Sequence, residues 1–331
     1  MKTDMNRTAS SAITPLSRSR IDLVDLARGL ALLAMFVFHF AYDLSYFGLI
    51  DVDVPAEPGW RIFARLIAGS FLALVGVSLV LATRNGLNRA AYLKRLAMVA
   101  GAAALVTLGT WFAMRPSFIF FGILHHVAVA SVLALPFLRL PTIAIAASAA
   151  LAFALPWLVT HPLLDQPWAV WLGLSRMPLQ TADFVPVFPW FGCVLAGMTV
   201  ARLLLPTLDT ARWARWRATA RPARLVAWGG RHSLLVYLVH QPLFIGALML
   251  AMQFIVLPAP EEQPFLRSCQ RSCAAGSLGA NACEQLCACT VDELKRESLW
   301  RKVLDNSMNP EETARTTRLA QACYARSSKR P

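Results

Sequence analysis

Residues 22–48 read DLVDLARGLALLAMFVFHFAYDLSYFG, an apolar run whose charges lie near its two ends and which encloses one histidine. As a helix, about 20 mostly apolar residues cross the hydrocarbon core of a bilayer. Six further runs of this kind follow along the chain. Pro156 interrupts the fifth of the seven runs, and helices in a membrane bundle tolerate such a proline. The pattern predicts an all-α fold, a polytopic membrane helix bundle of about seven spans. The six further runs lie at about 60–83, 94–114, 117–138, 141–160, 186–205 and 231–257.

The composition also indicates a membrane protein. Of the 331 residues, 56% are hydrophobic and 15% are charged, and the mean hydropathy is +0.50. Soluble domains average about 45–50% apolar and about 25% charged residues. These values exclude an ordinary cytosolic globular protein and a disordered chain. The first run is too long for the apolar part of a signal peptide and no cleavage pattern follows it, so we expect an uncleaved anchor.

The charge is distributed unevenly along the chain. The formal net charge is +13, from 32 basic and 19 acidic residues. Basic residues gather in the N-terminal segment and in the connections 84–95 and 202–231, whereas 43–59 contains no lysine or arginine. Cytoplasmic loops of membrane proteins carry such an excess. We therefore expect a multi-pass membrane protein with a cytoplasmic N-terminus and an extracytoplasmic C-terminus. Its expected partners are membrane lipids and no nucleic acid.

Ionisable side chains inside the spans are the first candidates for a functional site, because burying them in a membrane is costly. His39 and Asp43 are four residues apart in the first span and so share one face of a helix. A carboxylate in this position can fix the tautomer of an imidazole that acts as a general base. Alternatively, His39 is bonded to a backbone carbonyl and Asp43 is hydrated at the interface.

Two more spans contain histidines. Adjacent residues of a helix point about 100° apart, so at most one of His125 and His126 shares a cavity with His39, and we favour His125. The seventh span contains His240. Imidazoles at middle to outer depth on three spans predict a shared polar cavity, although each histidine alone is more often structural. Metal binding is disfavoured because adjacent histidines have poor geometry for one ion and no HExxH spacing occurs.

Four segments in order resemble one known family, the catalytic domain of heparan-α-glucosaminide N-acetyltransferase and its bacterial relatives. The resemblance covers about 20–256 and implies a multi-pass enzyme in which a membrane histidine is central to the chemistry. It implies transfer of an acetyl group from cytoplasmic acetyl-CoA, as co-substrate, to an amino sugar across the membrane. The resemblance to the bacterial relatives also implies a bacterial inner (plasma) membrane protein with a periplasmic C-terminus. The segments are RIDLVDLARGLA at 20–31 with FHFAYDL at 38–44, FGILH at 121–125, PVFPWFG at 186–192 and GRHSLLVYLVHQP at 230–242.

The residue pattern fits this chemistry, since acyl transfer needs a base and donors for the developing oxyanion. We expect an extracytoplasmic sugar or glycan as the acceptor, and neither its identity nor that of the acyl group follows from the sequence. No metal is expected. The catalytic candidates are His39, Asp43, His125 and His240. The candidates for substrate binding are Arg61, Arg65, Trp190, Tyr237 and Gln241. The candidates for binding the phosphates of CoA are Arg28, Arg84, Arg89 and Arg231.

A cysteine-rich tail follows the last span. Pairs spaced by four residues share a helical face, so two bridges could link two helices across a hinge at 274–281, and a third, such as Cys289 with Cys323, could close the module. Fifteen connectivities remain open, and zinc is the rival interpretation. We expect three regions: a cytoplasmic segment 1–20, a membrane acyltransferase-like domain 21–257 and a periplasmic helical module 258–331. The cysteines are Cys269, Cys273, Cys283, Cys287, Cys289 and Cys323.

Two other classes of function stay open on the sequence. One is a transporter whose intramembrane histidines relay protons. The other is a non-catalytic membrane protein that displays the periplasmic module. An enzyme would bind acyl-CoA and depend on His39, whereas a transporter would show pH-coupled flux without CoA. The oligomeric state also stays open, with a homodimer as one option.

Overall fold

The computed structural model describes residues 21–159, 161–176, 179, 181–208, 210–253, 262–274, 279–305 and 307–327. These residues form helices and no strand, with one isolated bridge between Phe121 and Phe184. The predicted all-α class is therefore confirmed. The chain divides into two compact units, Met1–Ala41 with Val54–Leu243 and Tyr42–Asp53 with Phe244–Pro331. We expected the membrane domain to end at 257. The boundary between the compact units instead lies after Leu243, within the last apolar helix, and residues 42–53 belong to the second unit.

Within the described residues, five helices are long and apolar enough to cross a membrane. They begin and end close to the predicted spans. Proline at the start of α2 needs no hydrogen-bond partner there, and the Asn88 side chain caps α3 by accepting a bond from the Ala91 N–H at 3.1 Å. The five are α1 (Asp22–Tyr46), α2 (Pro58–Thr83), α3 (Arg89–Ala113), α6 (Val187–Leu204) and α9 (Ser233–Met252).

The other two apolar runs form shorter helices, α4 (Ile123–Leu133) and α5 (Thr142–Leu158). A helix over the whole of 117–138 is not formed, since the residues before α4 pair with a distant segment. The Ala182 N–H donates to the Ser117 carbonyl at 2.9 Å, and the Val185 N–H donates to the Phe121 carbonyl at 3.1 Å. After α4, a short 3-10 helix, η2 (Pro136–Arg139), turns the chain toward α5.

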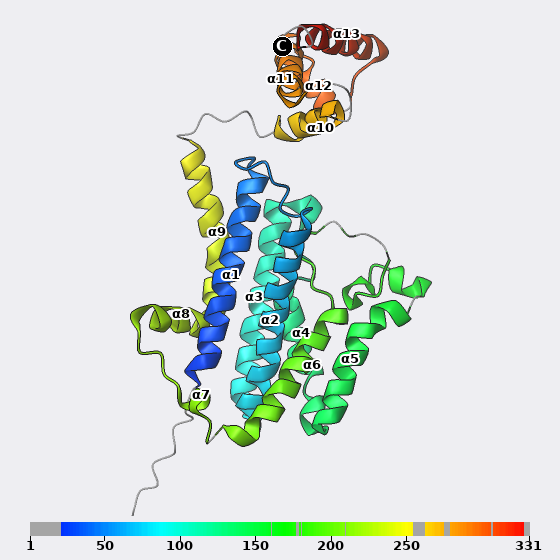
Figure 1. The fold of residues 1–331 in the computed structure, drawn as a ribbon. Coiled ribbons are helices and arrows are strands. Elements are labelled where there is room, and N and C mark those ends of the chain that lie inside the picture. Colours follow the sequence, from blue (N-terminus) through cyan, green and yellow to red (C-terminus); the bar gives the residue numbers. More distant parts are fainter. Residues whose placement is uncertain are drawn as a thin grey trace, which may run out of the picture. The chain divides into compact units, whose positions relative to one another are not determined.

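The core of the first unit lies where α6 packs against α2 and α5 (Figure 1). Leu72 of α2, Ile145 of α5 and Leu195 of α6 are almost completely buried in it. The backbones of α2 and α6 are in contact, because a Cβ on Gly76 would meet the Val194 carbonyl oxygen at 2.0 Å. Small residues allow such close packing of helices in a membrane.

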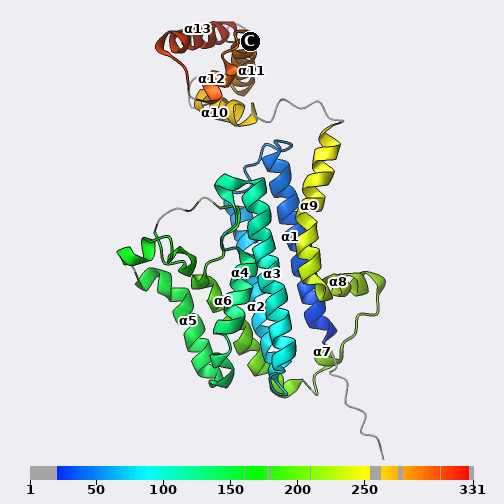
Figure 2. The same ribbon diagram turned by 180° about the vertical axis from the view of Figure 1, so that it is seen from behind.

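A second group of helices contains α1, α9 and α8 (Arg221–Arg231), which lie side by side in both views (Figures 1 and 2). Leu32 and Met35 of α1 pack against Val236 of α9. The chain turns at His232 between α8 and α9, so the predicted span starting at 231 begins two residues later. The remaining short elements of this unit are η1 (Arg115–Ser117), η3 (Pro162–Asp165), η4 (Val170–Leu172), η5 (Leu205–Thr207) and α7 (Arg212–Arg215).

The second unit contains a small helical module that three disulfides hold together: Cys269–Cys287, Cys273–Cys283 and Cys289–Cys323. The first two join α10 to α11 and the third joins α11 to α13, including the pair that the spacing suggested as a third bridge. Leu294 and Trp300 lie in its apolar core. The hinge residues 275–278 lie outside the described residues. The helices are α10 (Gln263–Ala274), α11 (Ala280–Arg296), α12 (Trp300–Leu304) and α13 (Pro310–Ser327).

Candidate active site

Two of the predicted histidines lie together in the first unit. The imidazole of His39, on α1, meets that of His240, on α9, edge to face with ring centroids 5.0 Å apart. His240 is 7% exposed, and Phe36 stacks on it at 5.6 Å. The His240 Nδ1 lies 2.5 Å from the Tyr237 carbonyl oxygen, which can only accept, so Nδ1 carries the proton. In the neutral ring Nε2 is then the basic nitrogen, which is the form that proton transfer requires.

Tyr237 lies next to His240 and within electrostatic range of the carboxylate of Asp183, which is half-buried. Its ring lies 5.6 Å from that of His240, and its phenol interacts electrostatically with the carboxylate of Asp183. Asp183 lies outside the membrane-spanning helices, where its Oδ2 accepts the Ile123 N–H at 2.9 Å at the start of α4. Burial raises the pKa of Asp183, and the bond from Ile123 opposes this shift. The arrangement brings together two imidazoles, one phenol and one carboxyl group.

Sequence reasoning missed Asp183. It is an acidic residue three positions before the first residue of the PVFPWFG segment, and that position is the signal that could have identified it. Gly122 makes room for the carboxylate, because a Cβ at Gly122 would meet the Asp183 Oδ2 at 2.4 Å. Gly122 and Ile123 of the FGILH segment therefore hold the carboxylate of Asp183, which lies 60 residues beyond Ile123 in the chain.

His125 is bonded within a chain of polar groups between α3 and α4. Its Nδ1 accepts the Gly122 N–H at 3.2 Å, so its Nε2 carries the proton and donates to the Thr107 hydroxyl at 3.0 Å. The Thr107 hydroxyl in turn donates to the Ile119 carbonyl at 2.7 Å. These bonds give His125 a structural task, and its catalytic role stays a prediction.

His126, the neighbour of His125 on α4 that we did not favour, is fully buried. Its Nδ1 lies 3.2 Å from the Val185 carbonyl and 3.1 Å from the Pro186 carbonyl, so it donates to this segment. Its Nε2 has no hydrogen-bond partner in the part of the chain that the structure describes. His126 thus helps to place the residues that follow Asp183.

The other predicted catalytic and substrate-binding residues lie on α1, α2, α6 and α9. Asp43 is 2% exposed and lies one helical turn beyond His39 on α1. Arg61 and Arg65 are exposed on one face of α2, near its start. Trp190 packs against the core between α2 and α6, and Gln241 follows His240 on α9. Their assigned roles remain predictions.

Charged side chains hold α1, α2 and α8 together. The Arg231 Nε lies 3.1 Å from the Asp25 Oδ2, and its Nη2 lies 3.1 Å from the Asp22 Oδ1. Arg28 pairs with Asp25 at 3.3 Å and also donates to the Ser78 hydroxyl. Arg28 and Arg231, both candidates for binding CoA, are therefore already engaged by carboxylates. The charged residues at the start of the first span therefore form ion pairs and hydrogen bonds that join α1 to α8 and α2.

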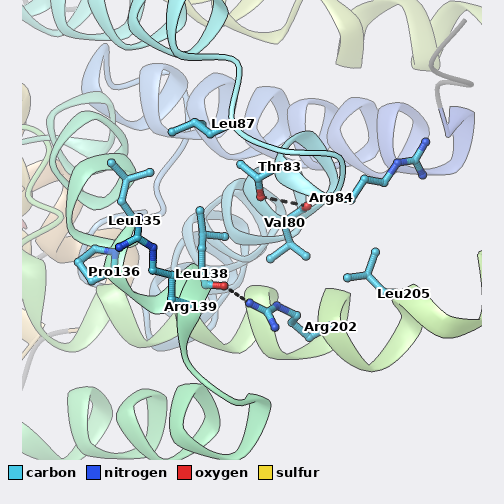
Figure 3. A pocket seen from close by; sticks show the side chains of 10 residues that line it. All are labelled: Val80, Thr83, Arg84, Leu87, Leu135, Pro136, Leu138, Arg139, Arg202 and Leu205. Carbon is cyan, nitrogen blue, oxygen red and sulfur yellow. Dashed lines mark hydrogen bonds between the residues drawn. The ribbon is translucent and has the colours of Figure 1, made fainter. Parts of the chain in front are cut away.

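Arg84, another such candidate, lines a cavity of about 700 Å³ at the end of α2 (Figure 3). Arg139 of η2 and Arg202 of α6 line it too, and of these two only Arg202 belongs to a connection, 202–231, that the sequence marks as strongly basic. Arg89 begins α3 and is not among the described residues that line the cavity. Among the described residues, no group of three His, Cys, Asp or Glu side chains is placed to hold a metal ion.

One comparison with known proteins gives a match. The family model described as "Heparan-alpha-glucosaminide N-acetyltransferase, catalytic" matches residues 20–242. No curated protein and no solved structure matches the chain. The matched range includes the histidine pair, Tyr237, Asp183 and the arginine-lined cavity, and it ends before the cysteine-rich module.

Proposed function

Because the chain belongs to the heparan-α-glucosaminide N-acetyltransferase catalytic family, a family of membrane acetyltransferases, we propose that it moves an acyl group across a membrane. The donor is acetyl-CoA on the cytoplasmic side, and the acceptor is an extracytoplasmic sugar or glycan in the envelope of a bacterium. The contact between His39 and His240, inside a group of apolar helices, is the observation that carries this proposal.

The reaction needs a base close to the acceptor. An amine or hydroxyl of the acceptor attacks the thioester carbonyl, the carbon–sulfur bond breaks, and an amide or ester and the CoA thiolate form. His39 takes the proton from the attacking group, and this proton finally reaches the thiolate to give free CoA. His240, whose Nδ1 is held by the Tyr237 carbonyl, orients the pair.

The negative charge that develops on the carbonyl oxygen needs hydrogen-bond donors. The Tyr237 hydroxyl and the Gln241 amide extend from the same helix as His240 and are the proposed donors. His39 lies 11 residues beyond Arg28 on α1, which is about 16 Å along the helix. A donor that enters from the arginine-rich end of the first unit must therefore extend into the bundle, as the long thioester arm of CoA can.

The test measures CoA release and acetyl transfer by the purified full-length protein, with acetyl-CoA labelled in its acetyl group. Because the acceptor is not identified, slow transfer of the acetyl group to water provides the measured reaction in its absence. We expect His39→Ala to lower the rate about a hundredfold or more, the usual contribution of a general base. His161→Ala is the matched control, since His161 is exposed before η3. A folded wild-type protein that neither binds nor cleaves acetyl-CoA contradicts the proposal.

The contact between two intramembrane imidazoles also suits a proton relay, which makes a proton-coupled transporter the second candidate. Protein reconstituted in liposomes would then carry a proton flux that His39→Ala and His240→Ala abolish. Such a flux without any CoA-dependent reaction favours the transporter over the acyltransferase.

A further inference from the structure

The cavity lined by Arg84, Arg139 and Arg202 lies where the end of α2, the 3-10 helix η2 and the end of α6 meet. In Figure 3 the guanidinium group of Arg202 lies closest to the middle of the view, with those of Arg139 and Arg84 on opposite sides of it. The three side chains come from segments far apart in the sequence and line one hollow.

The cavity is strongly cationic. Its described lining contains three arginines and no acidic residue. Within the part of the chain that the structure describes, none of the three forms an ion pair with a carboxylate, in contrast to Arg28 and Arg231. Guanidinium groups that face one hollow repel one another unless an anion lies between them, and their planar donor groups match the oxygens of a phosphate.

The same cavity is partly apolar and partly preorganised. Leu87, Leu135 and Leu205 contribute to its wall. Arg202 donates from Nη2 to the Leu138 carbonyl, which holds its guanidinium group in place and leaves other N–H groups for a ligand. A volume of about 700 Å³ is within the range of small-molecule sites, which spans about 300–1,000 Å³. A ligand that fits has phosphate groups next to an apolar part.

We propose that this cavity binds the phosphate-ester group of an amphiphilic ligand through Arg84, Arg139 and Arg202. Two sources offer this chemistry, namely the nucleotide phosphates of CoA and the headgroup of an anionic phospholipid. The first source rests on the proposed function. In that case these three arginines hold the phosphates of the donor, while Arg28 and Arg231 hold helices together.

The experiment measures binding of two probes to the purified full-length protein by calorimetry: CoA, and a short-chain phosphatidylglycerol. The variants are Arg139→Gln, Arg202→Gln and the double variant. Each substitution removes a charge-assisted hydrogen bond, so it should weaken binding of the true ligand about tenfold or more. Arg224→Gln is the matched control, because Arg224 is exposed on α8 and does not line the cavity. It should leave the affinity unchanged.

The two sources give different results. Weaker binding of CoA alone identifies a nucleotide site, and weaker binding of phosphatidylglycerol alone identifies a lipid site. If both variants and the wild type bind each probe equally, or if no probe binds to the folded wild type, the inference is wrong. Arg202→Gln also removes the hydrogen bond to the Leu138 carbonyl and so could disturb the fold. Arg139→Gln leaves that bond in place, so a loss of binding in this variant reports on the ligand.

The result is independent of the acyltransferase test. His39→Ala should lose turnover and keep arginine-dependent binding. Turnover that depends on His39 but has an unchanged KM for acetyl-CoA in Arg139→Gln and Arg202→Gln, together with unchanged lipid binding, overturns the cavity inference and leaves the function standing. Binding that depends on these arginines, in a protein without turnover, supports the cavity inference and contradicts the proposed function.

Discussion

At the scale of single residues, the environment of each polar group separates structural from chemical roles. His125 has both ring nitrogens bonded, to Gly122 and Thr107, whereas the rings of His39 and His240 face each other. The sequence contains all of these histidines but does not show which two meet. Its only signal for Asp183 is the position shortly before the PVFPWFG segment, and the surroundings that raise the pKa of this carboxyl group become visible only in the structure.

Asp183 makes stability depend on pH in a definite direction. Its folded-state pKa lies above its ordinary value because burial disfavours the charged form. Its contribution to stability is therefore full below the ordinary Asp pKa and is lost as the pH rises through the raised folded-state pKa. Asp183→Asn keeps an oxygen that can accept the Ile123 N–H and removes the charge. We expect wild type to lose thermal stability relative to this variant as the pH rises from acid to neutral.

Unfolding temperatures of the two proteins in the same detergent, measured across this pH range, give the check. Asp165→Asn is the control, since the pKa of Asp165 is shifted in the opposite direction: it is lowered, mainly because the Arg176 N–H donates a hydrogen bond to the carboxylate. Parallel curves for wild type and Asp183→Asn would contradict the expected direction.

At the scale of elements, glycines decide which helices can touch. The start of α1 and the end of α8 contain two of the segments that resemble the family, and the structure shows a physical reason for both. A Cβ on Gly29 would meet the Val226 carbonyl oxygen at 2.0 Å, and a Cβ on Gly230 would meet the Asp25 carbonyl oxygen at 1.8 Å. The two backbones cross at these glycines, and the ion pairs of Arg231 with Asp22 and Asp25 lie next to the crossing.

Gly230→Ala should therefore destabilise the protein. The added methyl group would collide with the backbone of α1, and overpacking of this kind typically costs about 1–3 kcal/mol. Gly229→Ala is a closely matched control, since nothing lies within 4 Å of a Cβ there and both residues belong to α8. Thermal unfolding in detergent compares the two variants. Equal unfolding temperatures for both would show that α1 and α8 do not pack as closely as described.

At the scale of the whole molecule, the chain combines a membrane unit with a small disulfide-linked unit. The family match ends at 242, so the cysteine-rich module is an addition to the catalytic domain. Its apolar core is small: one cluster contains the buried residues Val291, Leu294, Leu299 and Trp300, and the disulfide-bonded Cys287 and Cys323 are buried as well. Small domains of this kind depend on covalent links for part of their stability.

The three disulfides should not contribute equally. Cys289–Cys323 closes a sequence separation of 34 residues and Cys273–Cys283 one of 10. In the loop-entropy description the longer link restricts the unfolded chain more, by about 1 kcal/mol for this ratio of lengths. Replacing the Cys289–Cys323 pair by serines should therefore destabilise the module more than replacing Cys273–Cys283. Hydrogen exchange of amides in α11 of the full-length variants measures this difference, and a reversed order would contradict the expectation.

The sequence by itself determined the membrane helix bundle, the approximate ends of its long helices, the family and the helical, disulfide-linked tail. These features follow from local composition and spacing, because about 20 apolar residues suffice to define a span wherever they occur. Only the tertiary structure decided that His39 meets His240, that Asp183 joins Tyr237, and that Arg28 and Arg231 are ion-paired while Arg139 and Arg202 line a cavity. Each of these depends on packing between segments remote in the chain, and it is this packing that fixes the burial, the charge balance and the partners of a side chain.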